Sequence, residues 1–126
     1  MTHPEVLTPE AFKANFVEQG YAILRGFVAE NILLAMEAHI LGLCDELDAG
    51  HSLGDAMPVF EKNLADKMRA RDKLSKLFRL HRDHPVFNQF CCADVLKPYL
   101  EALLGKNYDC FLSQFIFKYP GALGQP

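Results

Sequence analysis

The stretch that decides the fold is Phe111-Leu-Ser-Gln-Phe-Ile-Phe-Lys118, which is followed by Tyr119-Pro-Gly-Ala-Leu-Gly-Gln-Pro126. Apolar residues are nearly continuous over residues 109–118. Such a run is typical of a strand that is covered on both faces. The proline and glycines after it predict a turn. One hydrophobic strand is unstable by itself, so residues 109–118 are predicted to pair with other strands, from this chain or from a partner.

Most of the chain before this strand has helical patterns. Thr8-Pro9-Glu10 predicts the start of a helix, because threonine can cap it and proline is tolerated in the first turn. Gly20 is placed to end that helix. Residues 21–25 predict a short strand. Apolar residues recur at helical spacing over residues 30–47 and predict a long amphipathic helix.

The middle of the chain is predicted to contain a loop and further helices. Glycines and a proline predict the loop at residues 49–58. The Lys- and Arg-rich residues 60–80 predict a helix, with a break near Asp72 as an alternative to a continuous one. Asp83-His-Pro85 predicts the start of a short helix, and Asp94 is placed to cap a last helix that Gly105 ends.

These patterns predict an α+β fold, in a single domain that is incomplete over residues 1–126. Residues 1–105 are expected to form a mainly helical part with one short early strand. Residues 106–126 are expected to form the first long strand and its loop. A chain of 126 residues is long enough for one domain with a modest core.

Composition excludes several classes of function. The net charge is −3 and no basic stripe exists, which argues against a nucleic-acid partner. No apolar run approaches the ~20 residues of a membrane span, and the N-terminus lacks the pattern of a signal peptide. Four cysteines form neither a CxxC pair nor a disulfide framework, so we expect reduced thiols and a cytoplasmic location.

Three blocks of sequence together carry a family resemblance. The first is Phe16-Val-Glu-Gln-Gly-Tyr-Ala-Ile-Leu-Arg-Gly-Phe27 and the second is Lys73-Leu-Ser-Lys-Leu-Phe-Arg-Leu-His-Arg-Asp-His-Pro-Val-Phe87. The third is Leu103-Leu-Gly105 followed by Phe111-Leu-Ser-Gln-Phe-Ile-Phe-Lys-Tyr-Pro-Gly121 and Gln125-Pro126. In this order and spacing they resemble the N-terminal half of the phytanoyl-CoA dioxygenase family, especially its domain-containing proteins.

The resemblance implies an Fe(II)- and 2-oxoglutarate-dependent oxygenase on a double-stranded β-helix, a jelly roll buttressed by an N-terminal helical region. Family members hold iron with two histidines and one carboxylate, a facial triad that leaves open coordination positions. Their His-x-Asp motif follows the Pro-Gly…Gln-Pro loop, and their distal histidine and 2-oxoglutarate-binding arginine lie further on. Residues 1–126 are therefore expected to contain no iron ligand and no catalytic residue, and to be inactive alone. The complete protein would hydroxylate a small metabolite or an acyl-CoA.

The resemblance carries over few individual residues. Gln114 occupies a strand position that contacts 2-oxoglutarate in relatives, although it could equally hydrogen-bond within the sheet. Lys73 stands near a lysine that reaches 2-oxoglutarate, and Lys76 is the alternative for that role. Both lysines could instead be solvated on a charged helix. Lys118, at the end of the strand, is a weaker candidate.

A second His-x-Asp sequence, His81-Arg82-Asp83, does not suit the iron motif. It precedes a predicted helix, whereas in the family the motif follows the long strand, and short motifs match easily by chance. We expect Asp83 to cap a helix and His81 to be half-buried.

Other clusters of reactive side chains carry little signal. His81, His84, Cys91 and Cys92 include adjacent cysteines in place of a CxxC pair, which is poor spacing for tetrahedral zinc. A cysteine nucleophile paired with His39 or His84 has no supporting pattern.

A different class of function stays open beside the enzyme. Residues 1–126 could form a non-catalytic, α-rich interaction domain that pairs through its C-terminal strand. An exposed hydrophobic strand is prone to edge-to-edge pairing, so this alternative predicts a homo-oligomer formed through residues 109–118.

Overall fold

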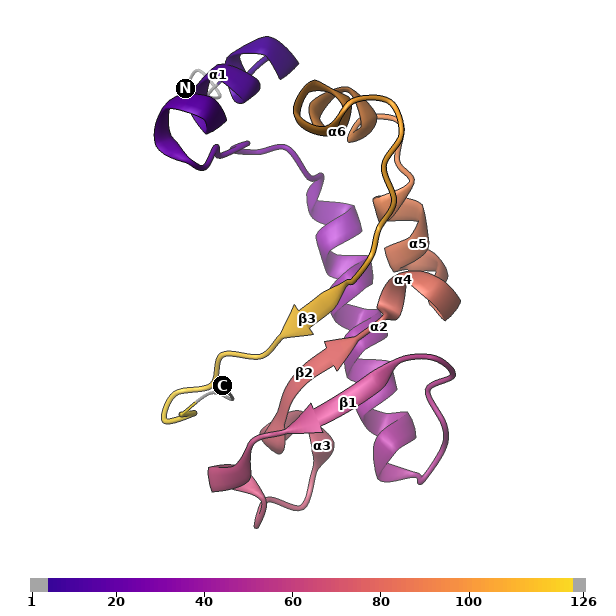
Figure 1. Cartoon of the computed structure of the whole chain (residues 1–126). Helices are drawn as coiled ribbons and strands as arrows, with labels where there is room; N and C mark the ends of the chain where they lie inside the picture. Colours follow the sequence, from indigo (N-terminus) through magenta and orange to yellow (C-terminus); the bar gives the residue numbers. More distant parts are fainter. Residues whose placement is uncertain (1–4, 124–126) are drawn as a thin grey trace.

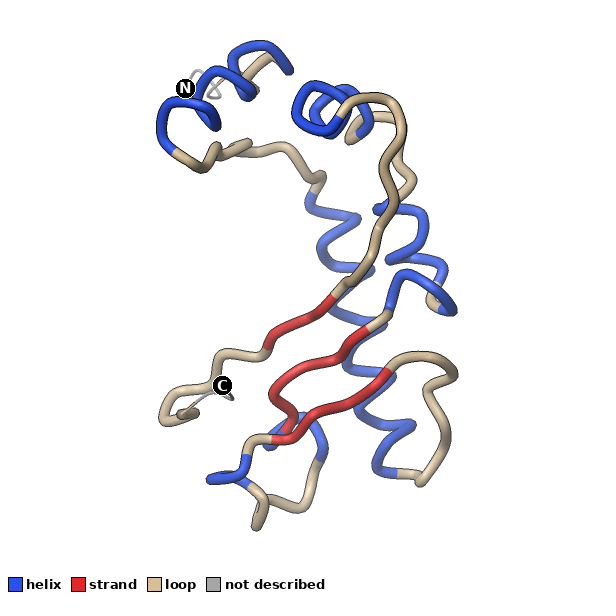
Figure 2. Tube along the Cα trace, in the orientation of Figure 1, coloured by secondary structure: helices blue, strands red, loops and turns tan. Residues whose placement is uncertain are grey.

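The computed structural model describes residues 5–123, so Gln125 and Pro126 of the third block lie outside the described residues. The chain is α+β, as predicted, with a small three-stranded antiparallel sheet (Figures 1 and 2). Its elements are α1 (Pro9–Gln19), α2 (Glu30–Asp48), β1 (Met57–Phe60), a 3₁₀ turn (Lys62–Leu64), α3 (Ala70–Lys73), β2 (Leu74–Phe78), α4 (Leu80–Asp83), α5 (Pro85–Cys91), α6 (Lys97–Leu104) and β3 (Gln114–Ile116).

The local signals for the first two helices are confirmed. The Thr8 hydroxyl accepts a hydrogen bond from the Ala11 backbone N–H at 3.2 Å and so caps α1. Gly20 ends the helix with a φ of +82°, a conformation that costs glycine little. The long helix predicted over residues 30–47 is α2, which ends at Asp48.

The short strand predicted at residues 21–25 is wrong. These residues form an irregular linker between α1 and α2. Tyr21 is 58% exposed and Ile23 is 51% exposed. A strand needs a partner backbone to bond its N–H and C=O groups, and the linker runs along the side of the molecule away from the sheet (Figure 1).

The helix predicted over residues 60–80 is also wrong. This segment contains the end of β1, the short helix α3 and the central strand β2. Leu74 and Leu77 are fully buried, and β2 has a bonded strand on each side. Packing and backbone pairing outweigh the weak helical spacing of its leucines, because strand preference depends strongly on context.

The sheet has the order β1-β2-β3, with both pairs antiparallel. Leu77 at its centre lies opposite Pro58 of β1 and Phe115 of β3. The long strand expected at residues 109–118 is confirmed only over Gln114–Ile116. The expected coverage of both faces is wrong, since Ile116 remains 42% exposed.

One helix, α2, covers one face of this sheet (Figure 1). Because residues directly opposite in an antiparallel pair point to the same face, Leu77 and Phe115 share the face toward α2. The core that joins helix and sheet contains Ile40, Leu43, Cys44, Leu74, Leu77 and Leu80, with Phe115 and Phe117 packed against it. Among the described residues, this single layer of helix leaves the other face of the sheet open.

For α5 and α6, the predicted signals at Pro85 and Gly105 are confirmed, whereas the predicted cap at Asp94 is wrong. Pro85 opens α5 as expected, but the short helix α4 precedes it. Asp94 does not cap α6, which begins at Lys97; its carboxylate instead accepts from the Lys97 Nζ at 2.9 Å. Gly105, with a φ of +80°, ends α6 as predicted.

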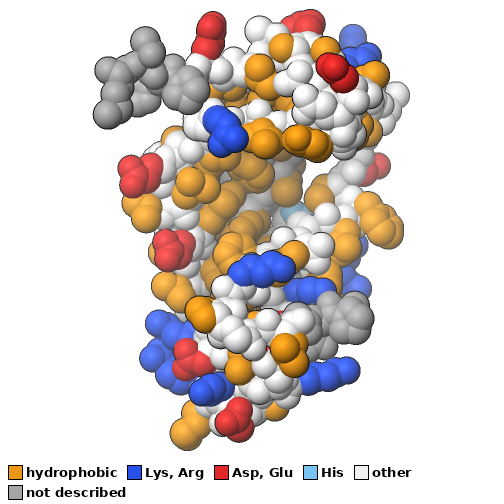
Figure 3. Space-filling view, turned by 90° about the vertical axis from the view of Figure 1, so that its left-hand side faces the viewer, with side chains coloured by type: hydrophobic (Ala, Val, Ile, Leu, Met, Phe, Trp, Pro, Cys, Tyr) orange, Lys and Arg blue, Asp and Glu red, His pale blue; other side chains and the backbone are white. Residues whose placement is uncertain are grey.

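Helices α1 and α6 form a second packed unit at the end of α2 away from the sheet (Figure 1). Tyr99 of α6 packs edge-on against Phe12 and Phe27, with ring centroids 5.4 and 5.2 Å apart. Its hydroxyl donates to the backbone carbonyl of Leu7 at 2.6 Å. Figure 3 shows that the surface between this unit and the sheet is hollowed and lined by hydrophobic side chains.

Candidate functional site

A small polar pocket lies where β2 meets the segment that follows β3. It has a volume of about 270 Å³. Glu61 and Ser75, both 1% exposed, line its inner part. Lys76, Lys118 and Tyr119 complete its polar lining. Five side chains that can donate or accept hydrogen bonds thus meet around one cavity.

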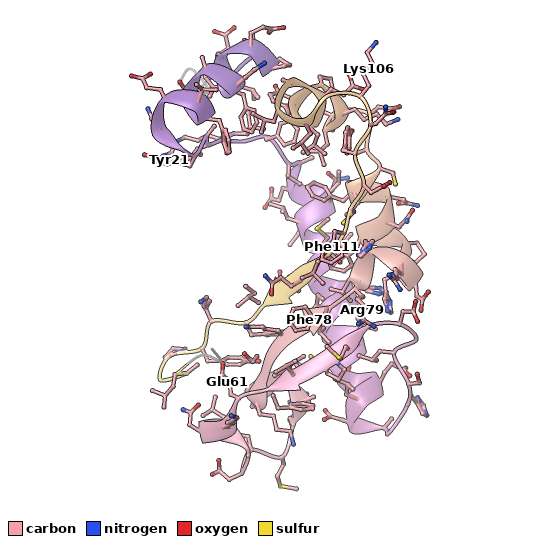
Figure 4. All side chains as sticks on the ribbon, viewed as in Figure 1. Tyr21, Glu61, Phe78, Arg79, Lys106 and Phe111 are labelled. Carbon is pink, nitrogen blue, oxygen red and sulfur yellow. The ribbon has the colours of Figure 1, made fainter. Side chains whose placement is uncertain are left out.

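Backbone bonds on both sides position these residues. The Glu61 N–H donates to the Lys73 carbonyl at 2.7 Å, which holds the end of β1 against the start of β2. The Phe117 N–H donates to the Ser75 carbonyl at 2.9 Å and continues the β2–β3 pairing by one residue. As Figure 4 shows, Glu61 then lies beside the C-terminal segment.

The Tyr119 phenol is a hydrogen-bond donor in this pocket. Burial raises its pKa to about 12, and the nearby acidic groups, including Asp72 and Glu61, add to the rise. Its hydroxyl is buried and makes no hydrogen bond of standard geometry within residues 5–123. The nearby Leu74 backbone lowers the pKa of the phenol and so opposes part of the increase. At neutral pH the phenol is therefore protonated and free to donate.

This donor set suits a small anion. The ammonium groups of Lys76 and Lys118 and the Tyr119 hydroxyl can each donate to a carboxylate, and bonds to charged groups are the stronger ones. Because like charges repel, the buried Glu61 carboxylate favours an orientation in which the anion faces Lys76 and Lys118. Among the residues proposed from sequence, Lys76 and Lys118 come together here, whereas sequence patterns carried no signal for Glu61, Ser75 or Tyr119.

Gln114 lies on the open face of the sheet and does not line the pocket. It is opposite Phe78, and Ile116 is opposite Lys76. Gln114 and Lys76 are therefore diagonal neighbours on one face, at the separation of about 7–8 Å that long side chains can span. The structure brings Gln114 near Lys76 and leaves its amide exposed.

Lys73 is placed elsewhere. It is the last residue of α3, and its Nζ lies 5.3 Å from the centroid of the Phe60 ring. A cation above an aromatic face is attracted by the ring. Of the two lysines considered for the same role, Lys76 lines the pocket, while Lys73 contacts Phe60.

His81 and Asp83 are both engaged in structural hydrogen bonds. The His81 backbone N–H donates to the Ser113 hydroxyl at 3.2 Å, and the ring Nδ1 bonds the same hydroxyl. The Asp83 carboxylate accepts from the Asp55 backbone N–H at 2.6 Å. His81 is half-buried as expected, but the expected cap is wrong, because Asp83 ends α4.

The loop that contains Gly54 packs tightly against Asp83, the last residue of α4. A Cβ on Gly54 would lie within 2.3 Å of the Asp83 carboxylate oxygen, and Gly54 also has a φ of +68°. Only glycine allows this close approach of backbone to side chain.

The residues described do not fit an iron centre. Within residues 5–123, no three His, Cys, Asp or Glu side chains are grouped so that they could hold a metal ion.

A pair of histidines joins α2 to the residue between α4 and α5. The Nε2 of His39 lies 2.9 Å from the Nδ1 of His84, and the His84 Nε2 lies 3.0 Å from the Leu53 carbonyl oxygen. Burial, and next the neighbouring His84, lower the pKa of His39. The two rings bond each other rather than a cysteine, a contact that sequence spacing did not reveal.

Comparisons with family models, with curated proteins and with solved structures gave no match for this chain. No helix in the described part of the chain is long and apolar enough to cross a membrane.

Proposed function

We propose that residues 1–126 are the N-terminal part of a phytanoyl-CoA dioxygenase-like, Fe(II)- and 2-oxoglutarate-dependent hydroxylase that acts on a small metabolite or an acyl-CoA. One observation carries the proposal. Within residues 5–123, the sheet is backed by α2 on one face only, and Lys76 and Gln114 stand on the open face beside an anion-sized pocket. These are residues that the resemblance associates with 2-oxoglutarate.

The open face is the side on which a jelly roll would be completed. Met57 and Ile116 on this face are 44% and 42% exposed, so a second sheet packed on it would bury apolar surface. In this proposal β1, β2 and β3 begin the barrel, and α2 is its buttress. The remaining strands and the iron ligands belong to sequence other than residues 1–126.

The residues of this chain would bind and orient the cosubstrate. Lys76 and Lys118 would each donate to a carboxylate of 2-oxoglutarate, and the protonated Tyr119 hydroxyl would donate a further bond. Iron, when bound by the rest of the protein, supplies activation of O₂. Residues 1–126 alone would be inactive.

The first test is the reading frame. Sequencing the transcript beyond codon 126 should show an in-frame His-x-Asp within a few codons. A stop codon directly after codon 126 would overturn the proposal for this gene.

The second test uses the product of the whole reading frame, assayed for 2-oxoglutarate decarboxylation with Fe(II). Lys76→Met should raise the KM for 2-oxoglutarate by about 10–100-fold, because a hydrogen bond to a charged group contributes about 1.5–3 kcal/mol. Lys106→Met, in the exposed turn after α6, is the matched control. Equal KM values for the two variants would exclude Lys76 from cosubstrate binding.

A second candidate function is a non-catalytic domain that pairs through its C-terminal strand. The observation that favours it is the position of β3 at the edge of the sheet, after a segment whose Phe111 is 94% exposed. An unpaired edge beside exposed aromatic side chains is a template for pairing with a second copy of the chain. A monomer at high concentration would count against this candidate.

A further inference from the structure

A second cavity lies between α2, α3 and the segment that runs from β3 to Tyr119. Its volume is about 360 Å³, which is within the range of about 300–1,000 Å³ for small-molecule sites. Ile40 and Leu41 of α2 line it, as do Phe115 and Phe117 of the facing segment. The centroids of these two phenylalanine rings are 5.2 Å apart. Much of the lining is therefore apolar.

Oppositely charged side chains lie toward the two ends of this cavity. Glu37 is one helical turn before Ile40 and Leu41 on α2, and it is exposed. Arg71 is tied farther along the same helix, because its Nη2 lies 3.1 Å from the Asp45 Oδ1. Positions 37 and 45 are eight residues apart, so their Cα atoms are about 12 Å apart along the helix axis. The acidic and the basic group are thus separated along the cavity.

Ring contacts indicate how the segment after β3 runs past α2. The Phe115 ring centroid lies 6.4 Å from that of Phe87, which in turn lies 6.0 Å from that of His39. Phe115 is therefore near the acidic end of the cavity. Tyr119, farther along the same segment, lines the cavity together with Arg71. The segment thus follows the cavity from its acidic end toward its basic end.

The polar groups at both ends are not fully used by the described part of the chain. Within residues 5–123, Glu37 forms no ion pair. The Arg71 Nε and the Tyr119 hydroxyl are buried, and neither has a hydrogen-bond partner among the same residues. A buried donor without an acceptor costs free energy. The basic end therefore favours an acceptor oxygen, and the acidic end favours a cation.

We propose that this cavity binds an ω-amino carboxylate, a small molecule with an ammonium and a carboxylate group at opposite ends of an apolar chain. The carboxylate accepts hydrogen bonds from Arg71, and the ammonium donates to Glu37. A small rotation of the lining side chains brings the shielded Arg71 Nε within reach of the ligand. The apolar chain of the ligand packs on Ile40 and Leu41. Glu37 and Arg71 do not line the pocket that contains Glu61, so this site is distinct from the one proposed for 2-oxoglutarate.

The separation of the charged ends selects the length of the ligand. The nitrogen and the carboxyl carbon of 6-aminohexanoate are joined by as many bonds as two residues of backbone, so the molecule reaches about 7 Å. The Glu37 and Arg71 side chains cover the remaining distance between the ends. An α-amino acid is too short to contact both. The other charged lining residues, Asp72 and Lys118, are exposed and opposite in sign, so together they add no net charge.

The test titrates the isotope-labelled chain with 6-aminohexanoate and follows the backbone amide shifts by NMR. We expect saturable shifts at millimolar ligand, centred on residues 37–41 and 115–119. Three comparison compounds each lack one feature: hexanoate lacks the ammonium, hexylamine lacks the carboxylate, and 4-aminobutyrate is shorter. Each should bind about threefold or more weakly than 6-aminohexanoate, because it loses one of the two end contacts.

Two variants remove the charged ends one at a time. Arg71→Gln should raise the Kd for 6-aminohexanoate about tenfold, because the ligand loses a hydrogen bond to a charged group. Glu37→Gln, at an exposed site, should raise this Kd about two- to fivefold and leave the Kd for hexanoate unchanged. Arg82→Gln is the matched control, since Arg82 also pairs with an exposed aspartate, at 3.5 Å. Glu18→Gln, on α1, is the control for the glutamate.

Several outcomes would overturn the proposal. They are no saturable shift at millimolar 6-aminohexanoate, equal binding of any comparison compound, or shifts confined to the lining of the pocket proposed for 2-oxoglutarate. Equal Kd values for Arg71→Gln and Arg82→Gln would overturn it as well. Because Glu37 is exposed, its glutamine variant should keep the native circular dichroism spectrum, and it tests the site even where Arg71→Gln is unstable. Failure of this proposal would leave the KM test of Lys76 unaffected, since Lys76 does not line this cavity.

Discussion

The His39 and His84 rings form a hydrogen bond between α2 and the start of α5, with 2.9 Å between the His39 Nε2 and the His84 Nδ1. The Leu53 carbonyl can only accept, so the His84 Nε2 carries a hydrogen and its Nδ1 is an acceptor in the neutral ring. The His39 Nε2 must then donate. If both rings are protonated, two N–H groups face each other and the bond is lost.

This arrangement predicts a stability that depends on pH. The pKa of His39 is lowered in the folded chain, first by burial and then by His84. Below about pH 6.5 the unfolded chain therefore binds more protons than the folded chain. The free energy of unfolding should be highest above this pH and should fall as the pH drops through it. Urea unfolding between pH 8 and 5 measures the slope.

The control separates titration from packing. His39→Gln keeps a donor for His84 but cannot titrate, so its stability should vary less with pH in this window. Equal slopes for His39→Gln and the parent would contradict the prediction.

The backbone conformation of Arg79 predicts that its substitution by glycine will not destabilise the folded chain. It has a φ of +65°, it is exposed, and it lies between β2 and α4 (Figure 4). A left-handed conformation costs an L-residue about 1–2 kcal/mol, which glycine avoids. Arg79→Gly should leave the free energy of unfolding unchanged or raise it by up to about 1 kcal/mol, whereas Arg79→Val should lower it.

Arg82→Gly is the matched comparison for this prediction. Arg82 lies in α4 with ordinary helical backbone, where glycine costs about 1 kcal/mol relative to a good helix former. Its contact with Asp55 is exposed and 3.5 Å long, so losing it should matter little. Chemical denaturation should rank Arg79→Gly above Arg82→Gly, and the reverse order would show that Arg79 is not strained.

The Tyr119 phenol is predicted to lose its proton at a higher pH than an ordinary tyrosine. Its pKa is raised to about 12, compared with about 10 for an ordinary tyrosine. Above pH 10 the unfolded chain loses this proton more readily, so the free energy of unfolding should fall as the pH rises from 10 toward 12. Ultraviolet absorbance at high pH should show a step that Tyr119→Phe removes. Tyr21→Phe, at an exposed site, should leave that step in place.

The exposed edge of the sheet predicts self-association. Phe111→Lys places a charge beside β3 and should weaken any dimer roughly tenfold or more, because burying a large apolar side chain contributes about 1.5–3 kcal/mol. Met68→Lys, at a residue 93% exposed and far from this strand in the sequence, is the control. Sedimentation velocity compares the variants. A parent chain that stays monomeric would remove the basis for the pairing function.

Local signals predicted part of this fold well. Thr8 and Gly20 bound α1, Gly105 ends α6 and Pro85 opens α5, because each acts on backbone groups within a few residues of itself. The site was predicted less well. The sequence points to Lys76 and Lys118 among several lysines, but no local pattern distinguishes a lysine in a pocket from one above a phenylalanine ring.

The sequence by itself determined the α+β class, the long helix α2 and a strand near the C-terminus, since helical hydrogen bonds and caps are made within the segment that carries them. Only the tertiary structure decided that residues 74–78 form the central strand of a sheet. It also decided which side chains meet, as in the pair His39–His84. The physical reason is that strand pairing and side-chain contacts depend on partners far away in the chain, which no local pattern encodes.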